Sequence, residues 1–148
     1  MPTELPVPNN DIIKALKELT VSGATVDDRY QLNVSFSDEI LTLKIMGFLL
    51  QPIPLEFSNR FEHVMASHQI RRLMIDLSEC TYMSSAVMSY LVKYFDITND
   101  IGGTVAVVRP PAKVLAVLKA IGLDTFFTFY PSVTEARTAL AQIRISLP

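Results

Sequence analysis

A nearly uninterrupted apolar segment in the middle of the chain constrains the fold most. Residues 70–77 read Ile-Arg-Arg-Leu-Met-Ile-Asp-Leu. A strand with one face in water alternates apolar and polar residues, whereas a continuous apolar run indicates a strand that is covered on both faces. We therefore expect this segment to lie at the centre of a sheet that carries helices.

Two alternating segments precede this central strand. Tyr30–Phe36 alternates strictly, so that every second residue shares one face of a sheet. In residues 40–46, Leu41, Leu43 and Ile45 alternate against Thr42 and Lys44. The intervening Ser-Asp-Glu has the composition of a turn, so the two segments predict an antiparallel hairpin.

The second half of the chain alternates helical and strand patterns. Helices are predicted at residues 57–68, 84–99, 111–121 and 132–143, and short strands at 104–108 and 126–130. Gly122 stands where a left-handed C-cap is expected, and Ser132 with Glu135 forms a capping box. In the third helix the predicted buried residues are Val114, Leu115, Leu118 and Ile121. The order predicts an α/β fold: a mixed sheet of about four to five strands, first the hairpin and then parallel strands, packed with helices.

The amino-terminal end has a different composition. It begins with a proline-rich stretch, after which Asn10 is able to cap a short helix with Ile12, Leu16 and Leu19 on one face. Gly23 and the polar residues up to Arg29 are typical of a connection. We therefore predict an extension with a short helix at residues 1–28 and one domain at residues 29–148. The extension either covers a sheet edge or mediates a homodimer.

Composition limits the partners and the compartment. The chain has 148 residues, 49% of them hydrophobic, and a formal net charge of −2 without a basic stripe, so we expect no nucleic-acid partner. Cys80 is the single cysteine, which excludes an intrachain disulfide and favours a reducing compartment. No signal-peptide pattern and no apolar run of roughly 20 residues occur. We expect a cytoplasmic protein that does not insert into a membrane.

Motifs for catalysis, metals and cofactors are missing from the sequence. It contains no Walker or dinucleotide loop, and neither Ser84 nor Ser85 lies in a Gly-x-Ser-x-Gly elbow. His63 and His68 point about 140° apart on a predicted helix, so they do not form a metal site with Cys80. Asp76 is interpreted as a structural cap of the following loop. We expect no metal, no cofactor and no enzymatic activity, with a serine nucleophile at Ser84 or Ser85 as the remaining catalytic alternative.

The order of motifs from Leu73 to Leu140 resembles the STAS family. The predicted central strand ends in Ile-Asp-Leu-Ser, and residues 80–86 then read Cys-Thr-Tyr-Met-Ser-Ser-Ala at the start of a helix, where the family usually has Asp-Ser-Ser/Thr-Gly. Gly102-Gly103, the strand at 105–108, Gly122-Leu123 and residues 130–136 follow in the family's order. The resemblance covers roughly residues 30–143 and implies the STAS fold.

By this resemblance, the chain is similar to bacterial anti-sigma factor antagonists. Such domains bind an anti-sigma factor that is also a serine kinase, and the kinase phosphorylates the hydroxyl before the family's glycine, which a phosphatase reverses. Ser85 occupies that position, and Ser84 is the second choice for modification. The implied partner-binding residues are Thr81, Tyr82, Met83, Ser84, Ser85 and Met88.

Several alternatives remain open at this point. One serine of the pair is expected to act as the N-cap of its helix, a role compatible with phosphorylation. Met83 replaces the family's acidic residue and Ala86 its glycine, which favours an unswitched STAS scaffold or a transporter-associated subunit as the alternative function. Met74 is predicted to be in the core, whereas Met83 and Met88 are predicted to be exposed in an adaptable binding surface.

Overall fold

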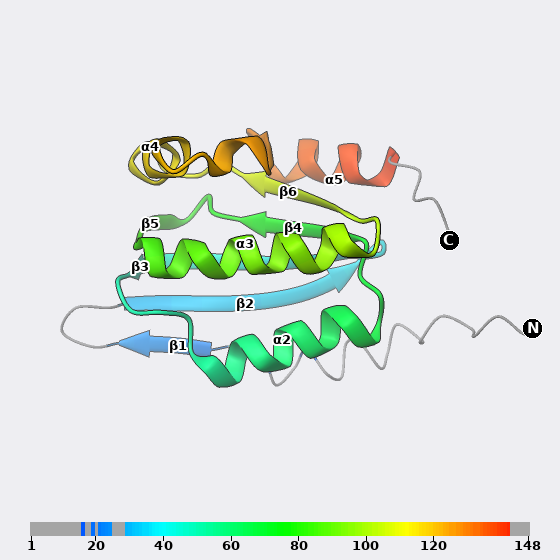
Figure 1. Cartoon of the computed structure of the whole chain (residues 1–148), viewed down its shortest axis with the longest axis horizontal. Coiled ribbons are helices and arrows are strands. Elements are labelled where there is room, and N and C mark those ends of the chain that lie inside the picture. Colours follow the sequence, from blue (N-terminus) through cyan, green and yellow to red (C-terminus); the bar gives the residue numbers. More distant parts are fainter. Residues whose placement is uncertain (1–15, 17–18, 20, 25–28, 143–148) are drawn as a thin grey trace, which may run out of the picture.

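A mixed sheet forms the centre of the computed structural model, which describes residues 16, 19, 21–24 and 29–142 (Figure 1). Within those residues the sheet has seven strands in the order β1-β2-β3-β4-β6-β7, and β5 pairs with β3 outside this path. The strands are β1 (Val21–Ala24), β2 (Arg29–Ser37), β3 (Ile40–Leu49), β4 (Arg72–Asp76), β5 (Cys80–Met83), β6 (Thr104–Val108) and β7 (Thr128–Tyr130).

The predicted hairpin is confirmed as β2 and β3, which pair antiparallel from Ser37–Ile40 outward. Its turn residues Asp38 and Glu39 both have positive φ, 53° and 62°, as the tight hairpin turns that match strand twist require. Arg137 holds the turn from outside, because its guanidinium donates to a carboxylate oxygen of Asp38 at 2.8 Å. The hairpin is therefore fixed both by its turn and by a distant helix.

The predicted central strand is confirmed as β4. It pairs parallel with β3 on one side and with β6 on the other. Leu73, Met74, Ile75 and Asp76 are all buried, which explains why the apolar run in the sequence is almost continuous.

Helices cover the two faces of the sheet unequally. They are α2 (Leu55–Ser67), α3 (Ser85–Asp100), α4 (Ala112–Ala120) and α5 (Val133–Gln142), with a 3₁₀ turn η1 at Leu123–Thr125. Figure 1 shows α2 and α3 side by side on one face, where they enclose the main core. α5 packs on the other face against β4 and β6, where a smaller cluster consists of Ile40, Met74, Ala106, Val108, Ala136 and Leu140.

The helix boundaries follow their sequence signals closely. Ser132 Oγ accepts a hydrogen bond from the Glu135 amide at 3.1 Å, as its N-cap position predicts. Gly122 has φ 78° directly after the C-cap of α4, which confirms the left-handed position. Ile121 was predicted to be buried and is 51% exposed, because α4 ends at Ala120 and the buried stripe ends with it.

The amino-terminal part differs from the sequence prediction at one point. Gly23 and Ala24, predicted as the start of a connection, belong to strand β1, which pairs antiparallel with the first half of β2. Leu16 and Leu19 are buried in the main core, whereas Asn10 and Ile12 of the predicted helix, and Ile143 of the last one, lie outside the described residues.

Candidate functional site

Among the described residues, strand β5 pairs with the sheet only at the end of β3. β3 pairs with β4 from Leu41 to Lys44 and then with β5 from Gly47 to Leu49, with a register shift at Gly47. Gly47 has φ 91°, and a Cβ at this position would lie 2.2 Å from the Arg29 carbonyl oxygen. Only glycine fits both constraints, so this residue sets where β5 begins.

Ser84 connects β5 to α3. Its backbone N–H donates to the Leu49 carbonyl oxygen at 2.9 Å, and its Oγ accepts a hydrogen bond from the Val87 amide at 3.4 Å. Ser84 is therefore the N-cap of α3, as predicted for one serine of the pair. Its hydroxyl is occupied in holding the helix start.

Ser85 is the first residue of α3 and is exposed. The first amide groups of a helix have no partner within the helix, and they point toward the space beyond its amino end. An anion on the Ser85 hydroxyl would lie close to these groups. Ser84 is thus the capping residue, whereas Ser85 is exposed to solvent.

Two further predicted site residues lie on β5. Thr81 is exposed, and Tyr82 is half-buried and stacks on Phe48 of β3, with ring centroids 5.2 Å apart. Phe48 was not among the predicted site residues. The signal that could have found it is Gly47, since a glycine inside a strand pattern often marks a bulge and the approach of another strand.

The predicted exposure of Met83 and Met88 is wrong. Both side chains are 0% exposed and belong to the main core. Met83 is buried because β5 is a strand of the sheet rather than a loop, and Met88 lies on the face of α3 that packs inward with Val87 and Leu91. Met74 is buried, as predicted.

The loop before β5 is fixed by polar contacts. Asp76 is 5% exposed, and one of its oxygens accepts hydrogen bonds from the Ser78 amide at 3.0 Å and from the Ser78 hydroxyl at 2.6 Å. The Glu79 carbonyl oxygen accepts a hydrogen bond from the Gly47 amide at 3.0 Å. The Glu79 carboxylate pairs with the Lys44 ammonium group, and this side-chain contact raises the pKa of Lys44. Asp76 is thus the structural cap that the sequence predicted.

Cys80 begins β5 and is buried. Burial raises the pKa of its thiol to about 11, and an interaction with the Tyr82 backbone offsets this only in part. The thiolate is the reactive form of cysteine, so Cys80 is a packing residue at neutral pH.

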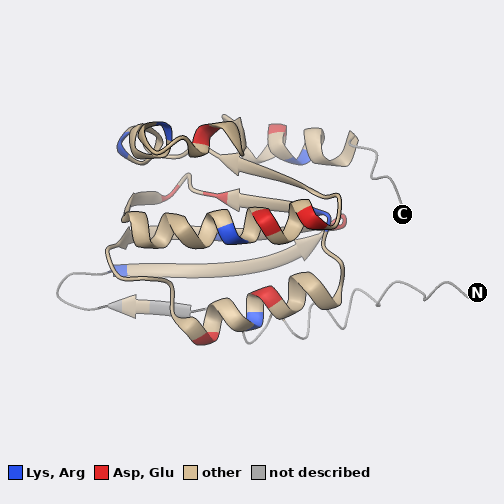
Figure 2. Ribbon diagram, viewed as in Figure 1, with Lys and Arg blue, Asp and Glu red and all other residues tan. Residues whose placement is uncertain are grey.

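Charge is absent from two segments that meet at this end of the sheet. Residues 45–55 and residues 80–92 contain no Asp, Glu, Lys or Arg. Figure 2 shows the consequence, since β5 and the first turns of α3 carry neither red nor blue. The strand before Ser85 and the first two turns of its helix therefore carry no charged side chain.

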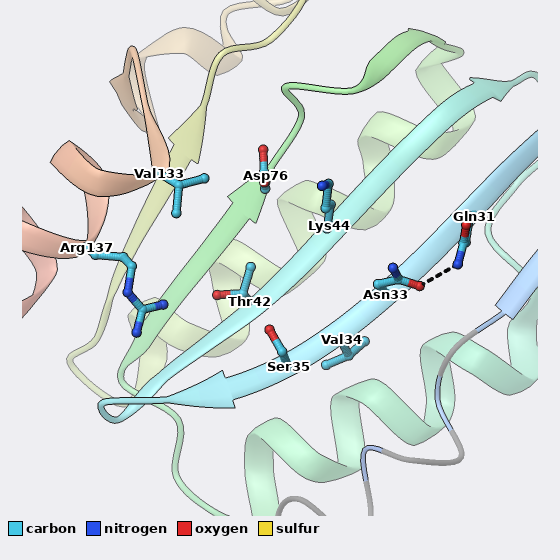
Figure 3. A pocket seen from close by; sticks show the side chains of 9 residues that line it. All are labelled: Gln31, Asn33, Val34, Ser35, Thr42, Lys44, Asp76, Val133 and Arg137. Atoms are coloured by element: carbon cyan, nitrogen blue, oxygen red, sulfur yellow. Dashed lines mark hydrogen bonds between the residues drawn. The ribbon is translucent and has the colours of Figure 1, made fainter.

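A shallow groove lies on the other face of the sheet (Figure 3). It has a volume of about 630 Å³ and is lined by Gln31, Asn33, Val34, Ser35, Thr42, Lys44, Asp76, Val133 and Arg137. Its two cations already have partners, Glu79 for Lys44 and Asp38 for Arg137. Within the described part of the chain, no three His, Cys, Asp or Glu residues are grouped to hold a metal ion, and none of the helices there is long and apolar enough to span a membrane.

Comparison with known proteins agrees with this architecture. The STAS domain model matches residues 31–136. A structure described as an anti-sigma factor antagonist of Thermotoga maritima has a TM-score of 0.62 and 20% identity, covering 75% of this chain and 95% of its own. An anti-sigma factor antagonist of Mycobacterium paratuberculosis gives 0.60 and 20%, with 80% and 98% covered. SpoIIAA, an anti-sigma factor antagonist in its unphosphorylated form, gives 0.59 and 10%, with 77% and 99% covered.

No individually curated protein matches the chain significantly. The family match nevertheless extends from the hairpin to the first turn of α5, and so includes β5 and the start of α3. The chain belongs to the STAS domain family.

Proposed function

We propose that the chain is a non-enzymatic regulatory domain of the cytoplasm that binds an anti-sigma factor through the surface around Ser85. The contact surface includes Thr81 and Tyr82 of β5 and the first turn of α3. In this proposal the anti-sigma factor is also the serine kinase, phosphorylation of Ser85 releases it, and a serine phosphatase restores binding.

The observation that carries the proposal is that two adjacent serines have different structural roles. Ser84 caps α3, so the exposed Ser85 hydroxyl is not needed to hold the helix. A phosphate adds about −1.5 to −2 charges and three acceptor oxygens. At a helix amino end this charge is favoured by roughly 0.3–1 kcal/mol, so the domain is able to carry it and stay folded.

The lack of charged side chains on β5 and in the first two turns of α3 supports a phosphate switch. A partner that buries Ser85 would have to remove water from a dianion for which these two elements offer no opposite charge. A penalty of about 1.4 kcal/mol already lowers the affinity tenfold. SpoIIAA supports this mode of regulation, because its solved structures include a phosphorylated form, with a TM-score of 0.52 and 12% identity to this chain.

Two positions favour a second candidate, an unswitched scaffold or transporter-associated subunit. Met83 and Ala86 replace the acidic residue and the glycine of the usual family motif. The Met83 side chain is in the core, so this position offers the surface no carboxylate for kinase recognition. The same surface would then bind a partner permanently.

Mass spectrometry separates the two candidates. The chain is incubated with ATP in a lysate of its native host, and the intact mass and modified site are determined. A single phosphate that is present on the wild type and the Ser84→Ala variant, and missing from Ser85→Ala, supports the switch. An unmodified wild-type chain that still binds the anti-sigma factor supports the scaffold.

The division of the chain at residue 28 is also a proposal. We propose that the extension of residues 1–28 covers the β2 edge of the sheet and does not mediate a homodimer. The pairing of β1 with β2 and the burial of Leu16 and Leu19 support this role. Light scattering of the full chain should give the monomer mass of 16.5 kDa, and a dimer mass would contradict the proposal.

A further inference from the structure

The floor of the groove in Figure 3 consists of directly paired strand positions. In the register of the sheet, Lys44 of β3 lies between Asn33 of β2 and Asp76 of β4. Ser35 and Thr42 form the next pair toward the hairpin turn. Opposite positions on neighbouring strands have Cβ atoms about 4.5–5.5 Å apart, so these polar side chains form one continuous surface.

Helix α5 forms a wall of the groove. Val133 and Arg137, one helical turn apart, line it, and the Arg137 guanidinium reaches the hairpin turn at Asp38. The volume of about 630 Å³ lies within the range of small-molecule sites, which is roughly 300–1,000 Å³. The groove is therefore large enough for a small ligand.

Asp76 distinguishes this groove from an ordinary solvated sheet face. Polar side chains on the open face of an antiparallel hairpin are usually exposed to water, whereas Asp76 lines the groove and is only 5% exposed. Its Oδ1 accepts both hydrogen bonds from Ser78. Its Oδ2 accepts none from the described residues and is not completely buried. A carboxylate oxygen in so buried a residue gains from a hydrogen-bond donor, which a ligand in the groove would supply.

Other hydrogen-bonding groups beside Asp76 are also open. Asn33 Oδ1 accepts from Gln31 Nε2 at 3.0 Å, which leaves the N–H groups of the Asn33 amide to donate to a ligand. The Thr42 hydroxyl has no partner among the described residues. The Lys44 ammonium group has further N–H groups besides the one directed at its carboxylate partner. Donors and an acceptor thus lie side by side, and a ligand with hydroxyl groups on neighbouring carbons both donates and accepts at this spacing.

The charges of the groove favour a neutral ligand. Lys44 pairs with Glu79, and Arg137 pairs with Asp38. An anion would compete with these carboxylates for either cation and would also approach Asp76. A cation would be repelled by Lys44, which is the neighbour of Asp76 in the register. A neutral polyol gains charge-assisted hydrogen bonds from both groups and leaves the ion pairs in place.

We propose that this groove binds a small neutral polyhydroxylated molecule, of the monosaccharide or cyclitol class, through two adjacent hydroxyl groups. One hydroxyl donates to Asp76 Oδ2 and accepts from the Lys44 ammonium group. The next hydroxyl accepts from the Asn33 amide, and Thr42 completes the site toward the hairpin turn. The groove lies on the face of the sheet opposite α3, so this ligand site is separate from Ser85 and does not depend on the proposed function.

The test is an NMR chemical-shift titration of the isotope-labelled full chain with myo-inositol and, separately, with D-glucose. We expect at least one of the two to cause saturable shifts confined to the residues that line the groove. The Kd should be in about the millimolar range, because a shallow groove provides few hydrogen bonds to a small ligand. Inorganic phosphate is titrated in parallel as the anionic probe.

Two variants remove groups of the site, and a third is the matched control. Asp76→Asn keeps the oxygen that accepts from Ser78 and replaces Oδ2 by an N–H donor, so the loop keeps its cap while the acceptor of the groove is lost. Thr42→Val removes one hydroxyl at nearly constant shape, so the result does not depend on the change at Asp76 being tolerated. Asn59→Ala removes an exposed amide from α2, on the opposite face of the sheet. Thermal unfolding shows whether each variant is folded.

The affinity for the polyol should fall at least about tenfold in Asp76→Asn, at least about threefold in Thr42→Val and less than about twofold in Asn59→Ala. Two polyols without saturable shifts, or an unchanged affinity in the folded groove variants, would overturn the site. Tighter binding of phosphate than of either polyol at the same residues would also overturn it, because the groove would then be an anion site. Each of these results leaves the proposed function at Ser85 untouched.

Discussion

The Ser84 amide donates a hydrogen bond to the Leu49 carbonyl oxygen at 2.9 Å, which fastens the cap of α3 to the last residue of β3. The position of Ser85 therefore depends on β3 as well as on α3. Leu49 of β3 is 36 residues away from Ser85 in the sequence.

Substitution of the two serines should affect stability differently. Ser84→Ala should lower the free energy of unfolding by about 0.5–1 kcal/mol, because the Val87 amide loses its capping acceptor. Ser85→Ala should change it by less than about 0.5 kcal/mol, since Ser85 is exposed. Urea unfolding of both variants measures the difference, and equal losses would show that Ser85 shares the capping role.

Gly47→Ala should be strongly destabilising. The new Cβ would approach the Arg29 carbonyl oxygen to 2.2 Å in a backbone with φ 91°, so both strain and a clash arise. We expect a loss of more than about 3 kcal/mol, measured by urea unfolding.

Gly102→Ala is the control for Gly47→Ala, since Gly102 has φ 79° with no atom within 4 Å of the added Cβ. It carries only the left-handed backbone cost of about 1–2 kcal/mol. Similar losses for the two variants would mean that the β2 backbone moves away from Gly47 without cost, in contradiction to the close approach of the Arg29 carbonyl oxygen.

A buried hydroxyl pair joins α2 to α3 and can be tested by a double-mutant cycle. Ser58 Oγ donates to a Glu62 carboxylate oxygen at 2.8 Å, so the Tyr94 hydroxyl, 2.8 Å from Ser58 Oγ, donates to Ser58. Ser58→Ala should cost about 1–3 kcal/mol, because it leaves the buried Tyr94 hydroxyl without an acceptor. Tyr94→Phe should cost about 0.5–1.5 kcal/mol, because Ser58 keeps Glu62.

The double variant Ser58→Ala with Tyr94→Phe should cost less than the sum of the single losses, since the unsatisfied hydroxyl is then gone. Chemical unfolding of all four proteins gives the coupling energy. Strict additivity would contradict the hydrogen bond between these two residues.

Stability should fall in alkaline solution in part because of Cys80. Its thiol ionises near 9.0 when the chain is unfolded and only at about 11 in the folded protein, so between these values the folded state holds the extra proton. The free energy of unfolding then decreases as pH rises, by up to about 1.4 kcal/mol per pH unit from this group. The burial that raises the pKa of Tyr94 adds a similar decrease at still higher pH.

Unfolding of the wild type and of Cys80→Ala at about pH 8 and about pH 10.5 isolates the cysteine contribution, since all other groups are common to both. The wild type should lose more stability than the variant over this interval. Parallel losses would show that Cys80 is more accessible to water than the structure indicates.

Sequence periodicity was sufficient to predict the strands and helices whose burial pattern is visible within their own residues. β2 and β3 were predicted from alternation, β4 from its continuous apolar run, and the end of α4 from Gly122. These signals are sufficient because each element shows its burial within a few residues. The prediction of Ser84 or Ser85 as a cap also depended only on the local helix start.

β1 and β5 could not be predicted in this way. Each has four residues, and each is a strand because of a partner that is distant in sequence. The exposure predicted for Met83 failed for the same reason, since the pairing of β5 with β3 places its side chain in the core. Met88 is buried because it shares the inner face of α3 with Val87 and Leu91. Phe48 likewise becomes part of the site only through Tyr82, which the bulge at Gly47 places beside it.

β3 pairs with β4 along its first half and with β5 at its end, and this change of partner affects which sequence changes the domain tolerates during evolution. Because β5 takes its register from Gly47 to Leu49 and not from β4, the turn at Ser78 is able to vary in length while Ser85 keeps its place. Insertions there would be absorbed as surface loops, whereas a single-residue deletion near Gly47 would shift β5 and Ser85 together. Lineages should therefore diverge freely in the turn and conserve the length of β3.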